Sequence, residues 1–182
     1  MKKIVIASDI HGSAYWCERL AEAYRAEEAD KLILLGDLLY HGPRNPLPDG
    51  HDPKRVAEIL SGLKNELVCV RGNCDAEVDQ MVLPFPVLAD YALLCVGEKT
   101  FYLTHGHLAD DKTPPPLKDG DILLNGHTHV PVGKKIGNAH YVNCGSVALP
   151  KEESPHSYLV YEDGVFLFKD LESGGIYDSY EL

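Results

Sequence analysis

The sequence of 182 residues is 45% apolar and 25% charged, which is ordinary for a soluble globular protein with a buried core. Its formal net charge of −11 argues against tight binding along a nucleic-acid backbone, and no apolar stretch approaches the roughly 20 residues of a membrane-spanning helix. The five scattered cysteines, without a Cys-x-x-Cys pair, favour reduced thiols over disulfides or a thiolate zinc site. We therefore expect one cytoplasmic domain over residues 1–182.

The first half of the chain alternates between apolar strands and helices. Strands are expected over residues 2–7, 31–35 and 67–70, and helices over residues 14–29 and 52–63. The first apolar run ends at Asp9 and is too short for a signal peptide. The loop over residues 39–50 is rich in Pro and Gly and has the length of a functional loop. This repeat predicts parallel strands whose carboxyl ends meet at one edge of a sheet.

The second half changes character, because Pro84-Phe85-Pro86 breaks the chain and helical patterns become rare. Short strands are expected over residues 92–96, 100–103, 121–124, 132–136, 140–142, 158–161 and 165–168. The pattern predicts two packed sheets, flanked by helices, that share one ligand-binding edge. Cys17, Cys69 and Cys95 lie among apolar residues and are expected in the core.

Polar residues that can bind metal follow the expected strands. They are Asp9, His11, Asp37, Asn73, His105, His127 and His129. A lone His-x-His pair is weak evidence of a metal site, but the convergence of parallel strand ends should bring these residues together. Carboxylate and amide oxygens mixed with imidazoles suit Mn²⁺, Fe²⁺ or Zn²⁺ better than Ca²⁺. The turn Asn143-Cys144-Gly145-Ser146 also follows a strand, and we expect it to support the metal-binding loops.

The order of these motifs resembles that of the calcineurin-like metallophosphoesterases. The motifs are Asp9-Ile10-His11, Gly36-Asp37, Gly72-Asn73-Cys74-Asp75, His105 and Gly126-His127-Thr128-His129. More narrowly, stretches such as His41-Gly42-Pro43-Arg44-Asn45 and Thr104-His105-Gly106-His107 are similar to the small bacterial phosphodiesterases of the YfcE type. The resemblance implies an α/β fold, namely a four-layer α/β/β/α sandwich of two mixed sheets flanked by helices.

The resemblance also implies a site for two divalent metal ions. Asp9, His11 and His129 would bind the first ion, Asn73, His105 and His127 would bind the second, and Asp37 would bridge both. Mn²⁺ is favoured, with Fe²⁺, Zn²⁺ or Ni²⁺ as alternatives. The implied activity is hydrolysis of a small or activated phosphodiester by a hydroxide bound between the two metals.

The expected catalytic group comprises Asn73, Cys74 and Asp75. The family commonly has His where this chain has Cys74, as a general acid oriented by the next carboxylate. A thiol, with an ordinary pKa of about 8.5 and weak hydrogen bonds, is a poor substitute. We therefore expect a preference for leaving groups that need little protonation, such as aryl phosphodiesters.

Candidate substrate-binding residues are Arg44, His41 and His107, of which Arg44 could bind phosphate oxygens in a fork geometry. The expected partner is a small phosphodiester substrate. We expect no association with a membrane, and binding of nucleic acid is disfavoured. A homo-oligomer, dimer or tetramer, is plausible from the resemblance. The competing hypotheses are a non-catalytic metal-binding scaffold of the same fold, a nuclease and, more remotely, a metallo-amidase.

Overall fold

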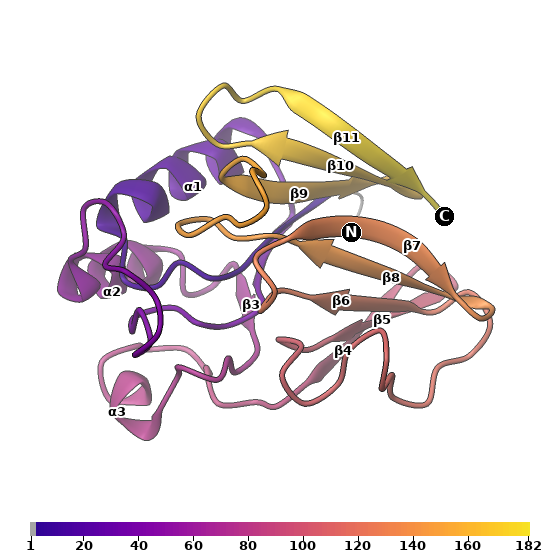
Figure 1. Cartoon of the computed structure of the whole chain (residues 1–182), viewed down its shortest axis with the longest axis horizontal. Helices are drawn as coiled ribbons and strands as arrows, with labels where there is room; N and C mark the ends of the chain where they lie inside the picture. The colour runs from indigo at the N-terminus through magenta and orange to yellow at the C-terminus, as the bar shows by residue number, and fades with distance from the viewer. Residues whose placement is uncertain (1–2) are drawn as a thin grey trace.

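Two β-sheets packed face to face form the centre of the structure, a computed structural model that describes residues 3–182 (Figure 1). The first sheet has the order β11 (Ile176–Glu181), β10 (Val165–Asp170), β9 (Ser157–Glu162), β1 (Lys3–Ala7), β2 (Lys31–Leu34) and β3 (Leu67–Cys69). The second has the order β4 (Ala92–Val96), β5 (Lys99–Leu103), β6 (Ile122–Asn125), β8 (Ala139–Cys144) and β7 (Pro131–Ile136).

Both sheets are mixed. Strands β1, β2 and β3 are parallel, and β9, β10 and β11 add to them as an antiparallel ribbon. In the second sheet β5, β6 and β8 are parallel, while β4 and β7 form antiparallel edges. The parallel strands in each sheet place the loops that follow them at a common edge, and those loops carry the predicted site.

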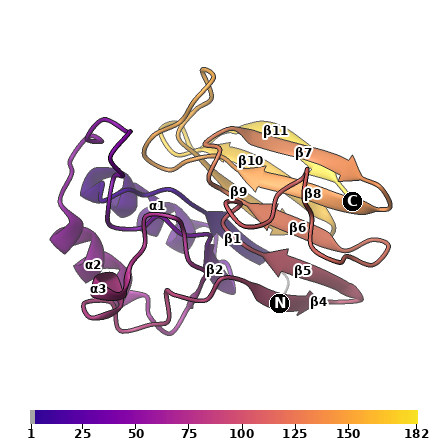
Figure 2. The ribbon, with the colours of Figure 1, turned by 60° about the horizontal axis from the view of Figure 1, so that its bottom comes forward.

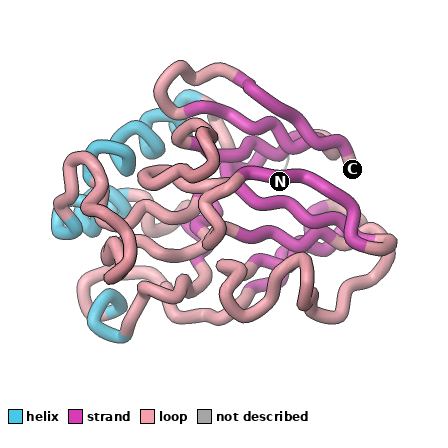
Figure 3. The backbone as a smooth tube through the Cα atoms, viewed as in Figure 1, coloured by secondary structure: helices cyan, strands magenta, loops and turns pink. Residues whose placement is uncertain are grey.

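Helices connect the parallel strands of the first sheet. Helix α1 (Ala14–Ala26) begins where the Ser13 hydroxyl accepts a hydrogen bond from the Trp16 amide at 3.2 Å. Helix α2 (Pro53–Gly62) begins with Pro53 after the Asp52 cap, which suits a first helical position. The third helix, α3 (Glu77–Gln80), is a single turn. Figure 3 shows the helices and long loops on one side of the molecule and most of the strands on the other.

The apolar core has two layers. One lies between the first sheet and helices α1 and α2, and contains Val5, Leu34, Leu20 and Leu60. The other lies between the two sheets and contains Ile4, Ile33, Phe101, Leu124 and Phe166. Burying each such side chain contributes about 1.5–3 kcal/mol, so the loops at the strand ends rest on a rigid base. From Ile4 to Ala7 β1 is buried on both faces, and this part of its sequence is accordingly apolar throughout rather than alternating.

Most of the expected elements are present, and the α/β class with two mixed sheets flanked by helices is confirmed. Helix α1 ends at Ala26, three residues earlier than expected, where Glu28 has a left-handed φ of 51°. Sequence analysis missed α3 and β11. The expected strand start at residue 2 lies outside the described residues. No helix in the described part of the chain is long and apolar enough to span a membrane.

The prediction that Cys95 lies in the core is wrong. Cys95 is exposed because β4 is an edge strand whose side chains alternate, so that Leu93 and Cys95 point away from the other sheet. Cys17 and Cys69 are buried as predicted. In Figure 2 β4 forms an edge of the second sheet. The loop over residues 106–120 contributes Asp111, which forms an ion pair with Lys134 of β7.

Candidate metal centre

Loops that follow β1, β2, β3, β5 and β6 converge at one edge of the two sheets. Backbone hydrogen bonds join the first two loops, from the Asp9 amide to the Gly36 carbonyl at 3.0 Å and from the His11 amide to the Asp37 carbonyl at 2.9 Å. The Gly126 amide donates to the His105 carbonyl at 2.9 Å and links the two loops of the second sheet. The predicted residues therefore lie together, as the parallel-strand pattern indicated.

Five of the seven predicted metal-binding residues have left-handed backbones although none is glycine. They are Asp9 (φ 60°), His11 (φ 49°), Asp37 (φ 56°), His127 (φ 66°) and His129 (φ 63°). Such conformations cost non-glycine residues about 1–3 kcal/mol each, and they concentrate at functional sites. The chain thus turns sharply after β1, β2 and β6 and directs the side chains of these residues into one space.

Two glycines allow the loops to approach one another. A Cβ atom on Gly72 would lie 2.0 Å from Oδ1 of Asp37, and one on Gly126 would lie 2.1 Å from the Ser8 hydroxyl oxygen. No side chain fits at such distances, so the glycines of the Gly-Asn and Gly-His motifs are required for the close packing of these loops.

Three histidines are oriented in the same way. The Nδ1–H groups of His11, His105 and His129 donate to the backbone carbonyl oxygens of Tyr40 (2.8 Å), Leu35 (2.7 Å) and Leu149 (2.5 Å). Because Nδ1 is occupied as a donor, the Nε2 atom of each ring faces the centre of the site and is the ring atom left to bind a metal ion. This is the arrangement by which backbone carbonyls orient metal-binding imidazoles.

Asp9, His11 and His129 form a first group of candidate ligands, with Asp9 at its centre. Its Oδ1 atom is 3.2 Å from His129 Nε2 and 3.4 Å from His11 Nε2, and those two nitrogens are 3.3 Å apart. The same oxygen is buried without a hydrogen-bond partner among the described residues. Burial alone would raise the pKa of Asp9, but the charge of His105 and the contacts with His11 and His129 hold it well below its ordinary value.

Asp37 lies beside this first group and beside a second group, which consists of Asn73, His105 and His127. Its Oδ2 atom is 3.7 Å from His11 Nε2 and 3.5 Å from His105 Nε2, and His105 Nε2 is 3.2 Å from the amide oxygen of Asn73. Burial lowers the pKa of His105, but Asp9 and Asp37 outweigh it and raise that pKa to about 9. The second group therefore also favours a positive charge at its centre.

His127 completes the second group. Its ring centroid is 5.0 Å from that of His105, and its backbone amide donates to Asp9 Oδ2 at 3.0 Å. Burial and the neighbouring charge of His105 lower the pKa of His127, which keeps its imidazole neutral and available as a ligand.

The donor set fits divalent metal ions. Lone pairs of nitrogen and oxygen face one another, so only a proton or another cation can relieve their repulsion. Possible ligand atoms lie within 4.8 Å of one another in the sets Asp9–His11–His129, Asp9–Asp37–His105 and His11–Asp37–Cys74. Imidazole nitrogens with carboxylate and amide oxygens suit Mn²⁺, Fe²⁺ and Zn²⁺.

Asp75 is buried and holds two of the site loops together. Its Oδ2 atom accepts hydrogen bonds from the Asp37 amide (2.8 Å) and the Gly72 amide (2.7 Å), and its Oδ1 atom accepts from the Leu38 amide (2.9 Å). These bonds fix the turn that carries Asp37 relative to the turn that carries Asn73. The carboxylate is therefore placed to position ligands.

Cys74 lies at the edge of the site, beside Asp37. Its amide donates to Asp37 Oδ1 at 2.8 Å, and the amide group of Asn73 donates to its Sγ atom at 3.2 Å. Burial and the negative charge of Asp37 raise the pKa of the Cys74 thiol to about 12. This side chain thus stays a neutral thiol at physiological pH, and it is a weak acid.

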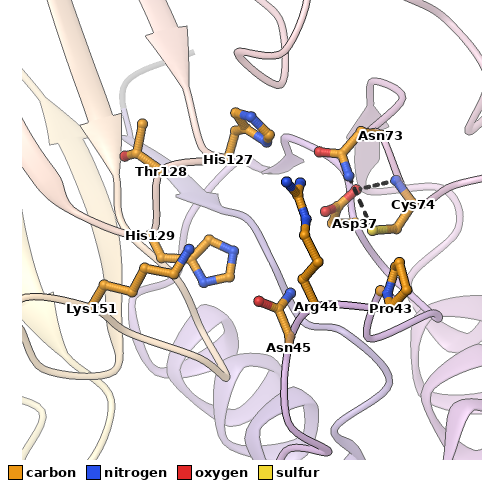
Figure 4. A pocket seen from close by; sticks show the side chains of 11 residues that line it. Asp37, Pro43, Arg44, Asn45, Asn73, Cys74, His127, Thr128, His129 and Lys151 are labelled. Atoms are coloured by element: carbon orange, nitrogen blue, oxygen red, sulfur yellow. Dashed lines mark hydrogen bonds between the residues drawn. The ribbon is translucent and has the colours of Figure 1, made fainter.

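A pocket of about 510 Å³ opens onto these residues (Figure 4). Arg44, which sequence analysis predicts to bind substrate, lines the pocket. Asn45, Thr128 and Lys151 also line it, and sequence analysis did not single them out as site residues. Figure 4 shows the Arg44 side chain extending into the middle of the pocket, between His127 and Asp37.

The other two predicted substrate-binding residues, His41 and His107, lie outside the lining of this pocket. The His41 ring packs edge-on against His51 with centroids 5.5 Å apart. His107 lies beside His105, with its ring centroid 5.4 Å from that of His105. The turn after β8 supports the loops as expected, since Ser146 Oγ donates to the Asp9 carbonyl at 3.0 Å.

A fold of two packed sheets with this constellation at their shared edge defines a class of phosphoesterases. The family model described as the calcineurin-like phosphoesterase superfamily domain matches residues 1–163, and the chain belongs to this family. The expected enzyme class of phosphoesterase is thereby confirmed.

Similar proteins include the phosphodiesterase YfcE of Escherichia coli, which is 44% identical over 165 residues, covering 91% of this chain and 90% of the relative. The solved structure of that E. coli phosphoesterase superposes with a TM-score of 0.96 at 41% identity, covering 98% of both chains. Zinc-bound Vps29 from Entamoeba histolytica shares the fold, with a TM-score of 0.61 at 19% identity over 98% of each chain.

Proposed function

We propose that this protein is a metal-dependent phosphodiesterase that hydrolyses small or activated phosphodiesters. One observation carries the proposal: the unpartnered, buried Oδ1 atom of Asp9 faces Nε2 of His11 and His129 at 3.4 and 3.2 Å. The family membership and the likeness to the E. coli phosphodiesterase support the same conclusion.

The proposed site takes two divalent ions, with Mn²⁺ favoured. Asp9, His11 and His129 would hold one, Asn73, His105 and His127 would hold the other, and Asp37 would bridge them. With ions bound, the site would gain Lewis acids for the phosphoryl oxygens and a water of lowered pKa.

Residues of the pocket bind and orient the substrate. The Arg44 guanidinium, with its fork of donors, binds a phosphoryl oxygen and holds the diester with one ester oxygen towards Cys74. Because the thiol of Cys74 is a weak acid, little proton transfer reaches the leaving group. Leaving groups that are stable as anions, such as nitrophenolates, are therefore favoured.

The cellular setting in the proposal is a reducing one. All five cysteines are free, which is in keeping with the cytoplasm. A homo-oligomer remains a prediction that light scattering of the purified protein would test.

Hydrolysis of bis(4-nitrophenyl) phosphate with added Mn²⁺ tests the proposed activity. We expect turnover by the wild type, loss of it in D37N, and near-normal turnover in D79N, which neutralises another buried carboxylate outside the proposed metal-binding residues. Wild-type protein that binds Mn²⁺ but turns over no diester would favour a non-catalytic scaffold. Digestion of single-stranded DNA at a comparable rate would favour a nuclease.

A further inference from the structure

Lys151 lies beside the pocket but is not one of the candidate metal ligands, so the proposed metal site gives it no role. It lines the pocket together with Arg44, and in Figure 4 its side chain lies beside His129, on the opposite side of the pocket from Cys74. Its amide donates to the carbonyl of His129 at 3.2 Å. The lysine is therefore fixed to the loop that carries one of the proposed metal ligands.

The turn that follows Lys151 fixes its backbone. The Lys151 carbonyl accepts hydrogen bonds from the amide (3.1 Å) and the hydroxyl (2.6 Å) of Ser154. Glu152 and Glu153 complete this turn with left-handed φ angles of 55° and 60°. A turn held in this way, with two residues in costly conformations, defines where the lysine side chain starts.

Neither cation of the pocket is neutralised by the protein. Across residues 3–182, the ion pairs include none of Arg44 or Lys151, and the acidic neighbours Glu152 and Glu153 do not pair with the lysine. In a chain with a net charge of −11, two unpaired cations at one pocket favour an anionic ligand.

A simple phosphodiester does not balance this charge. The carboxylates of Asp9 and Asp37 balance half the charge of two divalent ions. One phosphodiester anion and the attacking hydroxide balance the other half. Arg44 can share the phosphodiester oxygens, but Lys151 then remains without a partner.

We propose that Lys151 is a specificity-determining residue that binds a second anionic group, carboxylate or phosphate-like, on the part of the phosphodiester that is not the leaving group. The assignment to that part follows from Figure 4, since Lys151 and Cys74 flank the pocket from opposite sides. This inference rests on the proposed phosphodiesterase activity and names its substrate class: phosphodiesters that carry a further negative charge.

The test compares esters that share one leaving group. 4-Nitrophenyl phenyl phosphate carries a single charge, its 4-carboxyphenyl counterpart carries a second one, and a 4-phosphonomethyl counterpart separates a preference for charge from a preference for carboxylate shape. The variant is K151M, which keeps the length of the side chain. The matched control is K64M, which removes the same charge from an exposed lysine just beyond the far end of α2.

We expect K151M to lower the ratio of kcat/KM for the charged esters to that for the plain ester by about fivefold, which is typical of one partly screened charge pair, with most of the change in KM. K64M should keep the wild-type ratio. A wild-type enzyme without preference for the charged esters, or an equal fall on all three esters in K151M, would overturn the assignment.

Calorimetry provides a readout that does not depend on turnover. Binding of 4-carboxyphenyl phosphate and of phenyl phosphate is measured with metal-free and Mn²⁺-loaded protein. The wild type should bind the carboxylated ligand more tightly, and K151M should lose that advantage. If the wild type hydrolyses none of the esters, the phosphodiesterase proposal fails, and the calorimetric preference alone decides whether Lys151 binds the second anion.

Discussion

Replacing Asp75 by Asn tests whether this buried carboxylate organises the metal-binding loops. The two oxygens of Asp75 accept three amide hydrogen bonds, two at Oδ2 and one at Oδ1. An asparagine keeps one of these two oxygens and replaces the other by an NH₂ group, which cannot accept a hydrogen bond from the backbone amides facing it. In its better orientation it keeps the bonds from Asp37 and Gly72 and leaves the Leu38 amide unpaired.

An unpaired buried donor costs about 1–3 kcal/mol. We expect the free energy of unfolding of the metal-free protein to fall by about that amount in D75N. Because the lost bond joins the Asp37 loop to the Asn73 loop, we also expect Mn²⁺ affinity to fall by about 10- to 100-fold, as for other partners that orient metal ligands.

Urea unfolding in the presence of a chelator measures the first effect, and calorimetric titration with Mn²⁺ measures the second. The control is D79N, whose carboxylate is equally buried but accepts from the Ala76 amide rather than from the Asp37 loop. Unchanged Mn²⁺ affinity in D75N, or an equal loss in both variants, would refute the positioning role.

Two further predictions concern acid–base chemistry at the site. Cys74→His supplies an acid where the wild type has a thiol of pKa about 12, so turnover of alkyl phosphodiesters should rise in steady-state assays. No gain on any of these substrates would show that Cys74 does not occupy the acid position. In the metal-free protein the pKa of His105 is raised from its ordinary value to about 9. Protonated His105 therefore stabilises the folded state, fully below about pH 6.5, and this stabilisation is lost as the pH rises through 9. Urea midpoints with a chelator should therefore fall between pH 6.5 and 9, and H105Q should flatten this decline; parallel curves for both proteins would contradict the assigned pKa.

The places of the candidate metal-binding residues could be predicted from the sequence because their signal is local and repeated. Each follows an apolar strand, and parallel strands bring their ends together wherever the helices between them lie. The left-handed backbones of Asp9 and His127 had no such signal, since they arise from contacts between loops far apart in the chain. The same holds for the role of Asp75, whose partners include a turn 38 residues away.

Other features escaped prediction for different reasons. Lys151 lies 22 residues after His129 and reaches the pocket only because a backbone hydrogen bond joins the two loops. Strand β11 has mostly exposed side chains and pairs with β10 at the sheet edge, so it lacks the apolar run used to recognise strands. Cys95 was misplaced because a short apolar stretch does not distinguish an edge strand from a central one.

The central claim is that seven side chains at the shared edge of the two sheets bind two divalent cations. A crystal structure of the Mn²⁺-loaded protein, with anomalous scattering recorded for manganese, tests it most directly. We predict two manganese peaks, one among Asp9, His11 and His129 and one among Asn73, His105 and His127, with Asp37 contacting both. Peaks elsewhere, or none at this edge with Mn²⁺ in excess, would contradict the account.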